Sequence, residues 1–336
     1  MLTEENSLKR QTILSRAVIC ACVFSLASIS LLAQGQGQGQ GQGQAQGQGP
    51  GRPSDEDPGF KVAIYSRNPI EGAPTKGGTA SLSPIINHNG PVMYAPMAYL
   101  IWYGNWGQSN GTDTAEGKVL VKDFLYGINN SGYYKINATY PGVSGSVSIG
   151  GETIDAYSQG THLSDNNIKS IVSSAISSGK LNKDGNGVYF VLTSSDVAKT
   201  GFCSQYCGWH TATNIGGTTI KYSFVGNSAR CLNACAAQTV GPNNNAGVDG
   251  MLSVLAHELE EANTDPNLNA WYDASGAENA DKCAWTFGQN QSVASNGAYY
   301  NQTFSTQSGG TRNYLIQRNL SQLDNKCYVD ITKNTQ

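Results

Sequence analysis

The sequence predicts an α+β fold, a mixed β-sheet with packed helices, as a single disulfide-stapled domain over residues 60–327. Three observations support this prediction. Apolar residues repeat with the period of strands in some segments and of helices in others. Six cysteines lie in this region, an even number that suits disulfide pairing. The preceding residues are typical of a signal peptide and a linker, which implies an oxidising destination.

Strand-like and helix-like segments alternate along the domain. The continuously apolar run 187–194 is typical of a central strand covered on both faces. The run 98–104 is dense in β-forming residues and ends at a glycine, so we predict a second strand there. Asp165 is placed to cap a helix over 166–178. The other predicted elements are strands at 61–66, 133–140, 144–149 and 219–225 and helices at 117–128 and 247–266.

The first 59 residues show the pattern of an export signal and a spacer. Two basic residues precede an apolar run at 17–33, as in a secretory signal peptide. The alternative is a membrane anchor, but the run barely reaches the length of a span and contains serines. We expect a signal peptide at 1–33, a disordered Gly/Gln-rich linker at 34–59, a C-terminal tail at 328–336 and no stable membrane span after cleavage.

Composition narrows the class of partner. Lysine and arginine together number 21 against 24 aspartates and glutamates, so there is no basic excess to bind nucleic acid.

Six N-x-S/T sequons predict a glycoprotein in a eukaryotic host and carry no meaning in a bacterial one. They lie at Asn110, Asn129, Asn137, Asn290, Asn301 and Asn319.

The cysteines predict three disulfides. Cys20 and Cys22 belong to the predicted signal peptide, and the remaining six are Cys203, Cys207, Cys231, Cys235, Cys283 and Cys327. Fifteen pairings are conceivable, and the sequence does not choose among them. The two C-x-x-x-C pairs can close locally or join their two segments. A zinc site on these four cysteines is the alternative, which oxidising export disfavours.

The segment 247–266 carries the strongest chemical signal. At 100° per residue its apolar side chains form one stripe, and His257 and Glu261 fall one turn apart on the opposite side, with Glu258 between the two faces. This polar face is either solvated or turned into a cleft. In the second interpretation it resembles the H-E-x-x-H helix of zinc metalloproteases, with Glu261 in place of the second histidine. We then expect a zincin-like fold and site, with His257 and Glu261 as zinc ligands and Glu258 as the general base.

A zinc site needs a third protein ligand. Asp281 is our first candidate, and Glu278 is the other nearby acid, in a loop that Cys283 can lock in place. This loop is otherwise an ordinary acidic surface turn. His210 is a further candidate, although a lone histidine beside a cysteine is more often structural.

The motifs taken together resemble the EXORDIUM, or phosphate-induced, family of secreted proteins. The matching stretches are 99–104, 188–197, 201–210, 224–228 with Cys231 and Cys235, and 247–251. The resemblance implies an apoplastic or cell-wall protein linked to growth control, with no established enzymatic activity. Many plant members lack the His and Glu of the central helix, so this chain resembles a branch that retains them.

Two functions follow as hypotheses. The first is a secreted zinc metallohydrolase that acts on a peptide-like substrate. The second is a non-catalytic extracellular protein that regulates growth or binds a cell-wall polysaccharide. An aromatic cluster supports the second, because aromatic rings stack on sugars, although such strands are usually core. Its members are Tyr94, Tyr99, Trp102, Tyr103 and Trp106.

Overall fold

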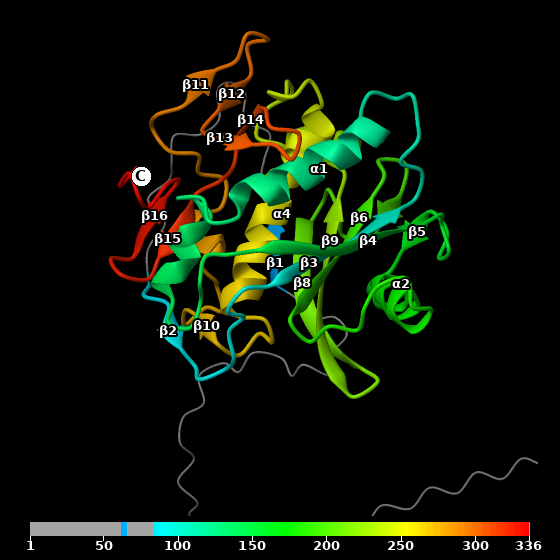
Figure 1. Ribbon diagram of the computed structural model, residues 1–336, viewed down its shortest axis with the longest axis horizontal. Coiled ribbons are helices and arrows are strands. Elements are labelled where there is room, and N and C mark those ends of the chain that lie inside the picture. The colour runs from blue at the N-terminus through cyan, green and yellow to red at the C-terminus, as the bar shows by residue number, and fades with distance from the viewer. Residues whose placement is uncertain (1–61, 66–82, 336) are drawn as a thin grey trace, which may run out of the picture. The chain divides into compact units, whose positions relative to one another are not determined.

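The computed structural model describes residues 62–65 and 83–335, drawn in colour in Figure 1. Within these residues lies a six-stranded sheet in the order β1-β8-β9-β6-β3-β4. Its strands are β1 (Val62–Tyr65), β3 (Met97–Tyr103), β4 (Ser148–Asp155), β6 (Gly187–Thr193), β8 (Tyr206–Ile215) and β9 (Thr218–Gly226). The pairs from β9 to β4 are parallel, and the pairs β1-β8 and β8-β9 are antiparallel. The predicted mixed sheet is confirmed, whereas the predicted signal peptide and linker lie outside the described residues.

Helices pack on this sheet, as predicted. α4 (Ala246–Thr264) contacts β8, β9 and α1 (Ala115–Ile128), whereas α2 (Asp165–Ser177) contacts β6 and β9. Figure 1 shows α2 well apart from α1 and α4. All seven residues of β6 are buried, as expected for a central strand covered on both faces.

The N-terminus of α2 differs by one residue from the prediction. Ser164, not Asp165, is the cap: its hydroxyl accepts from the Asn167 backbone N–H at 3.2 Å, and the Asn167 side chain accepts from the Ser164 N–H at 2.8 Å. This reciprocal pair is a capping box. Asp165 then becomes the first helical residue, where a negative charge is favoured by the helix dipole.

Two predicted strands and one unpredicted strand show where local pattern failed. The segment predicted as a strand at 133–140 forms the 3-10 helix η1 (Tyr134–Thr139), because its tyrosines reach polar groups of α4. The strand predicted at 144–149 begins later, as β4. β8 was not predicted, since Cys, Gly, Trp and His mask its period; it forms a hairpin with β9 through Gly216 and Gly217, both at positive φ.

The other described elements are short. They are the strands β2 (Ile86–Asn87), β5 (His162–Leu163), β7 (Ala198–Lys199), β10 (Trp271–Tyr272), β11 (Ser292–Val293), β12 (Tyr299–Tyr300), β13 (Gln302–Ser305), β14 (Thr311–Tyr314), β15 (Asn319–Ser321) and β16 (Lys326–Tyr328), the helix α3 (Leu232–Cys235) and the 3-10 helices η2 (Ser228–Arg230) and η3 (Asp281–Cys283). None of the helices in the described part of the chain has the length and hydrophobicity needed to span a membrane.

Three disulfides join the described segments, as the cysteine count predicted. They are Cys203–Cys231, Cys207–Cys235 and Cys283–Cys327. The two C-x-x-x-C pairs therefore join each other rather than closing locally, and they tie the start of β8 to the segment of η2 and α3. The third bond links η3 to β16.

Candidate metal centre

The helix α4 is buried from Gly247 to Thr264, including its polar face. His257, Glu258 and Glu261 each expose none of their surface. The interpretation of this face as solvated is therefore wrong, because these side chains point into the protein. Buried ionisable groups need charge partners, since burial disfavours their charged forms.

The close approach of β8 to α4 brings a second histidine to this face. Gly208 makes the approach possible: a Cβ there would lie 2.6 Å from Val254 Cγ1 and 3.0 Å from Glu258 Oε1. Because alternate strand residues share a face, His210 points to the same side of β8 as Gly208. Its imidazole is fully buried against α4.

One group of possible metal ligands consists of His257, Glu261 and Asp281. Their donor atoms all lie within 4.8 Å of one another. His257 Nε2 lies 2.9 Å from Glu261 Oε1 and 3.4 Å from Asp281 Oδ1. The Asp281 backbone N–H also donates to Glu261 Oε1 at 3.1 Å, which anchors η3 to the helix. The structure thus brings together the three residues that the sequence nominated.

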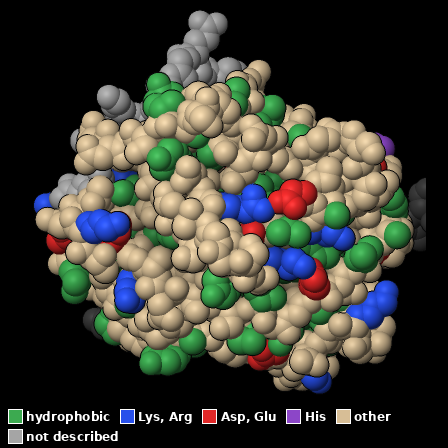
Figure 2. Space-filling model, turned by 45° about the horizontal axis from the view of Figure 1, so that its top comes forward, with side chains coloured by type: hydrophobic (Ala, Val, Ile, Leu, Met, Phe, Trp, Pro, Cys, Tyr) green, Lys and Arg blue, Asp and Glu red, His purple; other side chains and the backbone are tan. Residues whose placement is uncertain are grey.

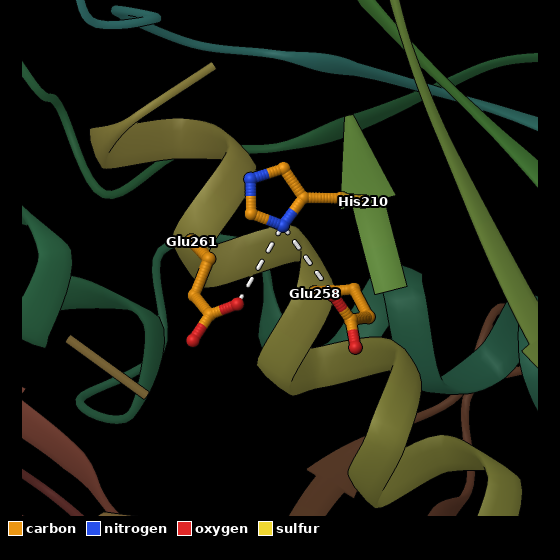
Figure 3. A group of neighbouring side chains, drawn as sticks. All are labelled: His210, Glu258 and Glu261. Carbon is orange, nitrogen blue, oxygen red and sulfur yellow. Dashed lines mark hydrogen bonds and ion pairs between the residues drawn. The ribbon is translucent and has the colours of Figure 1, made fainter. Parts of the chain in front are cut away.

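A second group consists of His210, Glu258 and Glu261, again with donor atoms within 4.8 Å of one another. Figure 3 shows the imidazole of His210 directed at both carboxylates, which project from α4. Its Nδ1 lies 3.4 Å from Glu258 Oε2 and 3.5 Å from Glu261 Oε2. Its Nε2 lies 3.8 Å from Glu278 Oε2. All three alternatives for the third ligand, Asp281, Glu278 and His210, therefore lie at one site.

The pKa values of the site are set by burial and by the pairing of its histidines with its carboxylates. Burial lowers the pKa of His210, but the Glu258 and Glu261 carboxylates outweigh burial and raise it to about 9. The same balance holds the pKa of His257 well above its usual range, with Glu261 as the main partner. Burial raises the pKa of Glu261, yet the His257 charge and the two imidazoles bring it down to about 2. Burial raises the pKa of Glu258 to about 7.

The residues present fit a divalent metal ion. Within the described part of the chain, Glu258 Oε1 and Glu261 Oε2 are buried and accept no hydrogen bond. A buried carboxylate oxygen without a donor is costly, and a cation would satisfy it. Imidazole nitrogens with carboxylate oxygens form an accepted ligand set for zinc and for other first-row divalent ions.

Two supporting features carry no signal in the sequence. The side-chain amide of Gln317 contacts Nδ1 of His257, which leaves Nε2 of that ring facing Glu261 and Asp281. A polar contact at the nitrogen that does not face the metal orients a ligating histidine. Gln317 lies in a C-terminal segment without periodicity, so only the fold reveals its role.

A buried amide network holds the loop before η3 against α4. Asn137 Oδ1 accepts from Asn279 Nδ2 at 3.0 Å and from Asn319 Nδ2 at 2.8 Å, and its own amide donates to Asn263 Oδ1 at 3.3 Å. Because Asn279 lies between Glu278 and Asp281, the network positions both acids. Glu260 belongs to this side of the helix, where it accepts from the Tyr133 hydroxyl at 3.1 Å.

The structure restricts two surface predictions. Of the predicted sugar-stacking cluster, Tyr99, Trp102, Tyr103 and Trp106 are core residues, and only Tyr94 is exposed. The cluster as a whole is therefore not a binding platform, because β3 is covered on both faces.

Among the sequons, Asn110, Asn129 and Asn290 are exposed. Asn137 and Asn319 are buried in the amide network, and the side-chain amide of Asn301 donates to two backbone carbonyls.

Comparison with known proteins identifies the family. The profile of the phosphate-induced protein 1 conserved region matches residues 85–329, and the chain belongs to this family. It is 33% identical to Protein EXORDIUM-like 3 of Arabidopsis thaliana over 284 residues, covering 71% of this chain and 81% of that protein. Over 286 residues it is 32% identical to EXORDIUM-like 5 of the same plant, covering 71% and 76%. Protein PHOSPHATE-INDUCED 1 of Nicotiana tabacum is 29% identical over 220 residues, covering 55% and 66%. The family predicted from the motifs is confirmed.

No solved structure matches this chain. The zincin-like fold expected from the helix motif therefore has no support from a solved structure.

Proposed function

We propose that this protein is an extracellular zinc-dependent hydrolase of the metallopeptidase type. The observation that carries the proposal is the convergence of His257, Glu261 and Asp281 within 4.8 Å in a buried site. These residues would hold the ion through one imidazole and two carboxylates. Bound zinc supplies Lewis acidity, which polarises a carbonyl and activates water near neutral pH.

Glu258 is the residue we assign to proton transfer. It directly follows His257 on α4, the position that the general base takes in the H-E-x-x-H helix. His210 Nδ1 lies 3.4 Å from Oε2 of this carboxylate, and Oε1 accepts no hydrogen bond from the described residues. One oxygen is thus anchored while the other remains available to a proton.

Substrate would approach from the side of η3. Among the described acids and histidines of the two groups, Asp281 alone exposes part of its side chain, 17%. The other ligands are fully buried, which excludes bulk water from the charges. We assign peptides as the substrate class, because the helix resembles that of metallopeptidases.

Secretion and a cell-wall location complete the proposal. Three disulfides suit an oxidising compartment, because the cytosol keeps thiols reduced. The first 33 residues are typical of a signal peptide, and the exposed Asn129 and Asn290 are the sequons we expect to be glycosylated.

The test uses tag-free, full-length protein secreted from a eukaryotic host. We expect zinc in the purified chain, and hydrolysis of a peptide library that stops with a chelator. Glu258→Gln should keep the ion at His257 and lose about 10²–10⁴-fold in rate. Glu116→Gln, whose side chain is 69% exposed on α1, is the matched control. A zinc-loaded wild type that cleaves the library no faster than Glu258→Gln would refute the hydrolase.

A second candidate function is non-catalytic binding of an acidic cell-wall polysaccharide. It is favoured by a cavity of about 610 Å³, lined by Trp102, Ala115, Lys118, Lys122, Glu152, Thr153, Ile154 and Lys180. Figure 2 shows one face on which basic side chains lie among acidic and apolar ones. Binding of polygalacturonate that weakens in Lys118→Ala, yet persists with a chelator and in Glu258→Gln, would support this function. No binding by the wild type would exclude it.

A further inference from the structure

Glu261 occupies a special position because it belongs to both groups of ligands. Its two oxygens face different histidines. Oε1 lies 2.9 Å from His257 Nε2, and Oε2 lies 3.5 Å from His210 Nδ1. A carboxylate that divides its oxygens between two ligand sets is the arrangement that bridges paired metal ions, which lie about 3.5–4 Å apart in two-metal hydrolases.

The second ligand set is built as fully as the first. His210 comes from β8, and Glu258 and Glu261 come from successive turns of α4, so all three are held by regular secondary structure. Each is fully buried. Glu261 Oε2 accepts no hydrogen bond from the described chain, so the set contains a carboxylate oxygen that a cation would satisfy.

One of the two histidines has a hydrogen-bonding partner on its other ring nitrogen. The Gln317 amide contacts His257 Nδ1, and metal-ligating histidines usually have such a partner, which fixes the ring. At His210, Glu278 Oε2 lies 3.8 Å from Nε2, beyond hydrogen-bond distance, so Glu278 adds a nearby acid to the second set but does not orient the ring.

Charge supports two ions rather than one. The ion pairs of Glu258, Glu261 and Asp281 within the described chain are with histidines, which are neutral when they bind a metal. The three ligand carboxylates and the adjacent Glu278 carboxylate carry four negative charges. One dication would leave two of these charges unbalanced, whereas two dications would balance all four.

We propose that the site holds two divalent cations bridged by Glu261. His257 and Asp281 complete the first ion's ligands, and His210 and Glu258 complete the second's. This inference rests on the metal centre proposed above and adds a second ion to it. Glu258 would contribute Oε2 to the second ion and keep Oε1 for the proton.

The experiment is a metal titration of full-length protein stripped with a chelator, using Zn²⁺ alone, with bound metal counted by elemental analysis after gel filtration. We expect two ions per chain in the wild type and one in His210→Ala. His162→Ala, an exposed histidine on β5, is the matched control and should keep two. Circular dichroism and thermal unfolding identify any variant that fails to fold.

A second measurement does not depend on variants. In the Co²⁺-loaded wild type, a bridged pair should show magnetic coupling, so that its electron paramagnetic resonance signal per ion falls when the second equivalent binds. One ion per chain in both the wild type and His210→Ala, without coupling, would overturn the two-ion site and leave the single centre standing. No bound ion in folded wild type would overturn both.

Discussion

Gly208→Ala tests how the spacing between β8 and α4 builds the site. The added Cβ would lie 2.6 Å from Val254 Cγ1, where ordinary contacts begin at 3.4 Å, and 3.0 Å from Glu258 Oε1. The two elements must therefore separate by about 1 Å, which as overpacking costs about 1–3 kcal/mol. In a domain of this size each kcal/mol lowers Tm by about 2–4 °C.

The same displacement should act on the metal ligands. It moves Glu258 away from His210, so we expect the second ion to bind about 10–100-fold more weakly while the ion at His257 is retained. Thermal unfolding measures the first effect, and Zn²⁺ titration by calorimetry measures the second.

Gly151→Ala is the matched control for this prediction. Gly151 also lies in a strand, β4, but a Cβ there would meet Leu181 Cδ2 at 3.5 Å, an ordinary contact. If Gly208→Ala behaved like Gly151→Ala in both assays, the close approach of β8 would not be what positions His210 and Glu258.

Three further predictions concern other parts of the account. Gln317→Ala should weaken Zn²⁺ binding about 10–100-fold in calorimetry, because His257 loses the group that orients it. Gln307→Ala, at an exposed position, is the control and should bind Zn²⁺ as the wild type does. Equal affinities in the two variants would contradict the role of Gln317. Replacing Cys203, Cys207, Cys231 and Cys235 by serine should lower the free energy of unfolding in denaturant titrations by about 2–5 kcal/mol, because both bonds that close the loop of 28 residues are then lost. An unchanged midpoint would show that packing alone holds α3 to β8. Burial raises the Asp249 pKa from 3.8 to about 6, so its protonated form favours the fold below pH 4, and this contribution is lost as the pH rises through 6. The free energy of unfolding of Asp249→Asn, measured relative to the wild type in denaturant titrations, should therefore rise by about 3 kcal/mol between pH 4 and pH 7. A difference that does not depend on pH would contradict the assignment.

Local sequence patterns predicted an element correctly where they matched its burial in the fold. The continuous apolar run of β6 and the N-terminal polar residues of α2 produced the elements they predict. The prediction of a strand at 133–140 was wrong, because alternate apolar residues suggest a strand whether the chain is extended or coiled. The tyrosines at its start show why. Their hydroxyls reach Glu260 and Asn263 on α4, and such long-range contacts are invisible in a local window.

The residues of the candidate site also differ in whether local sequence patterns could predict them. Helical spacing alone places His257, Glu258 and Glu261 on one helix, so the sequence could nominate them. Proximity in sequence suggested Asp281 and Glu278. Nothing local shows that His210 joins them, since that depends on the close packing of β8 on α4 at Gly208.

The central claim is that buried carboxylates of α4 bind a metal through Glu261. Its most direct test is the metal content of secreted, tag-free protein after Zn²⁺ titration and gel filtration, compared between Glu261→Gln and Glu260→Gln. Both positions are fully buried neighbours on α4, but only Glu261 faces the histidines. We predict bound zinc in the wild type and in Glu260→Gln and its loss in a folded Glu261→Gln. Equal zinc in both variants, or none in the folded wild type, would contradict the account.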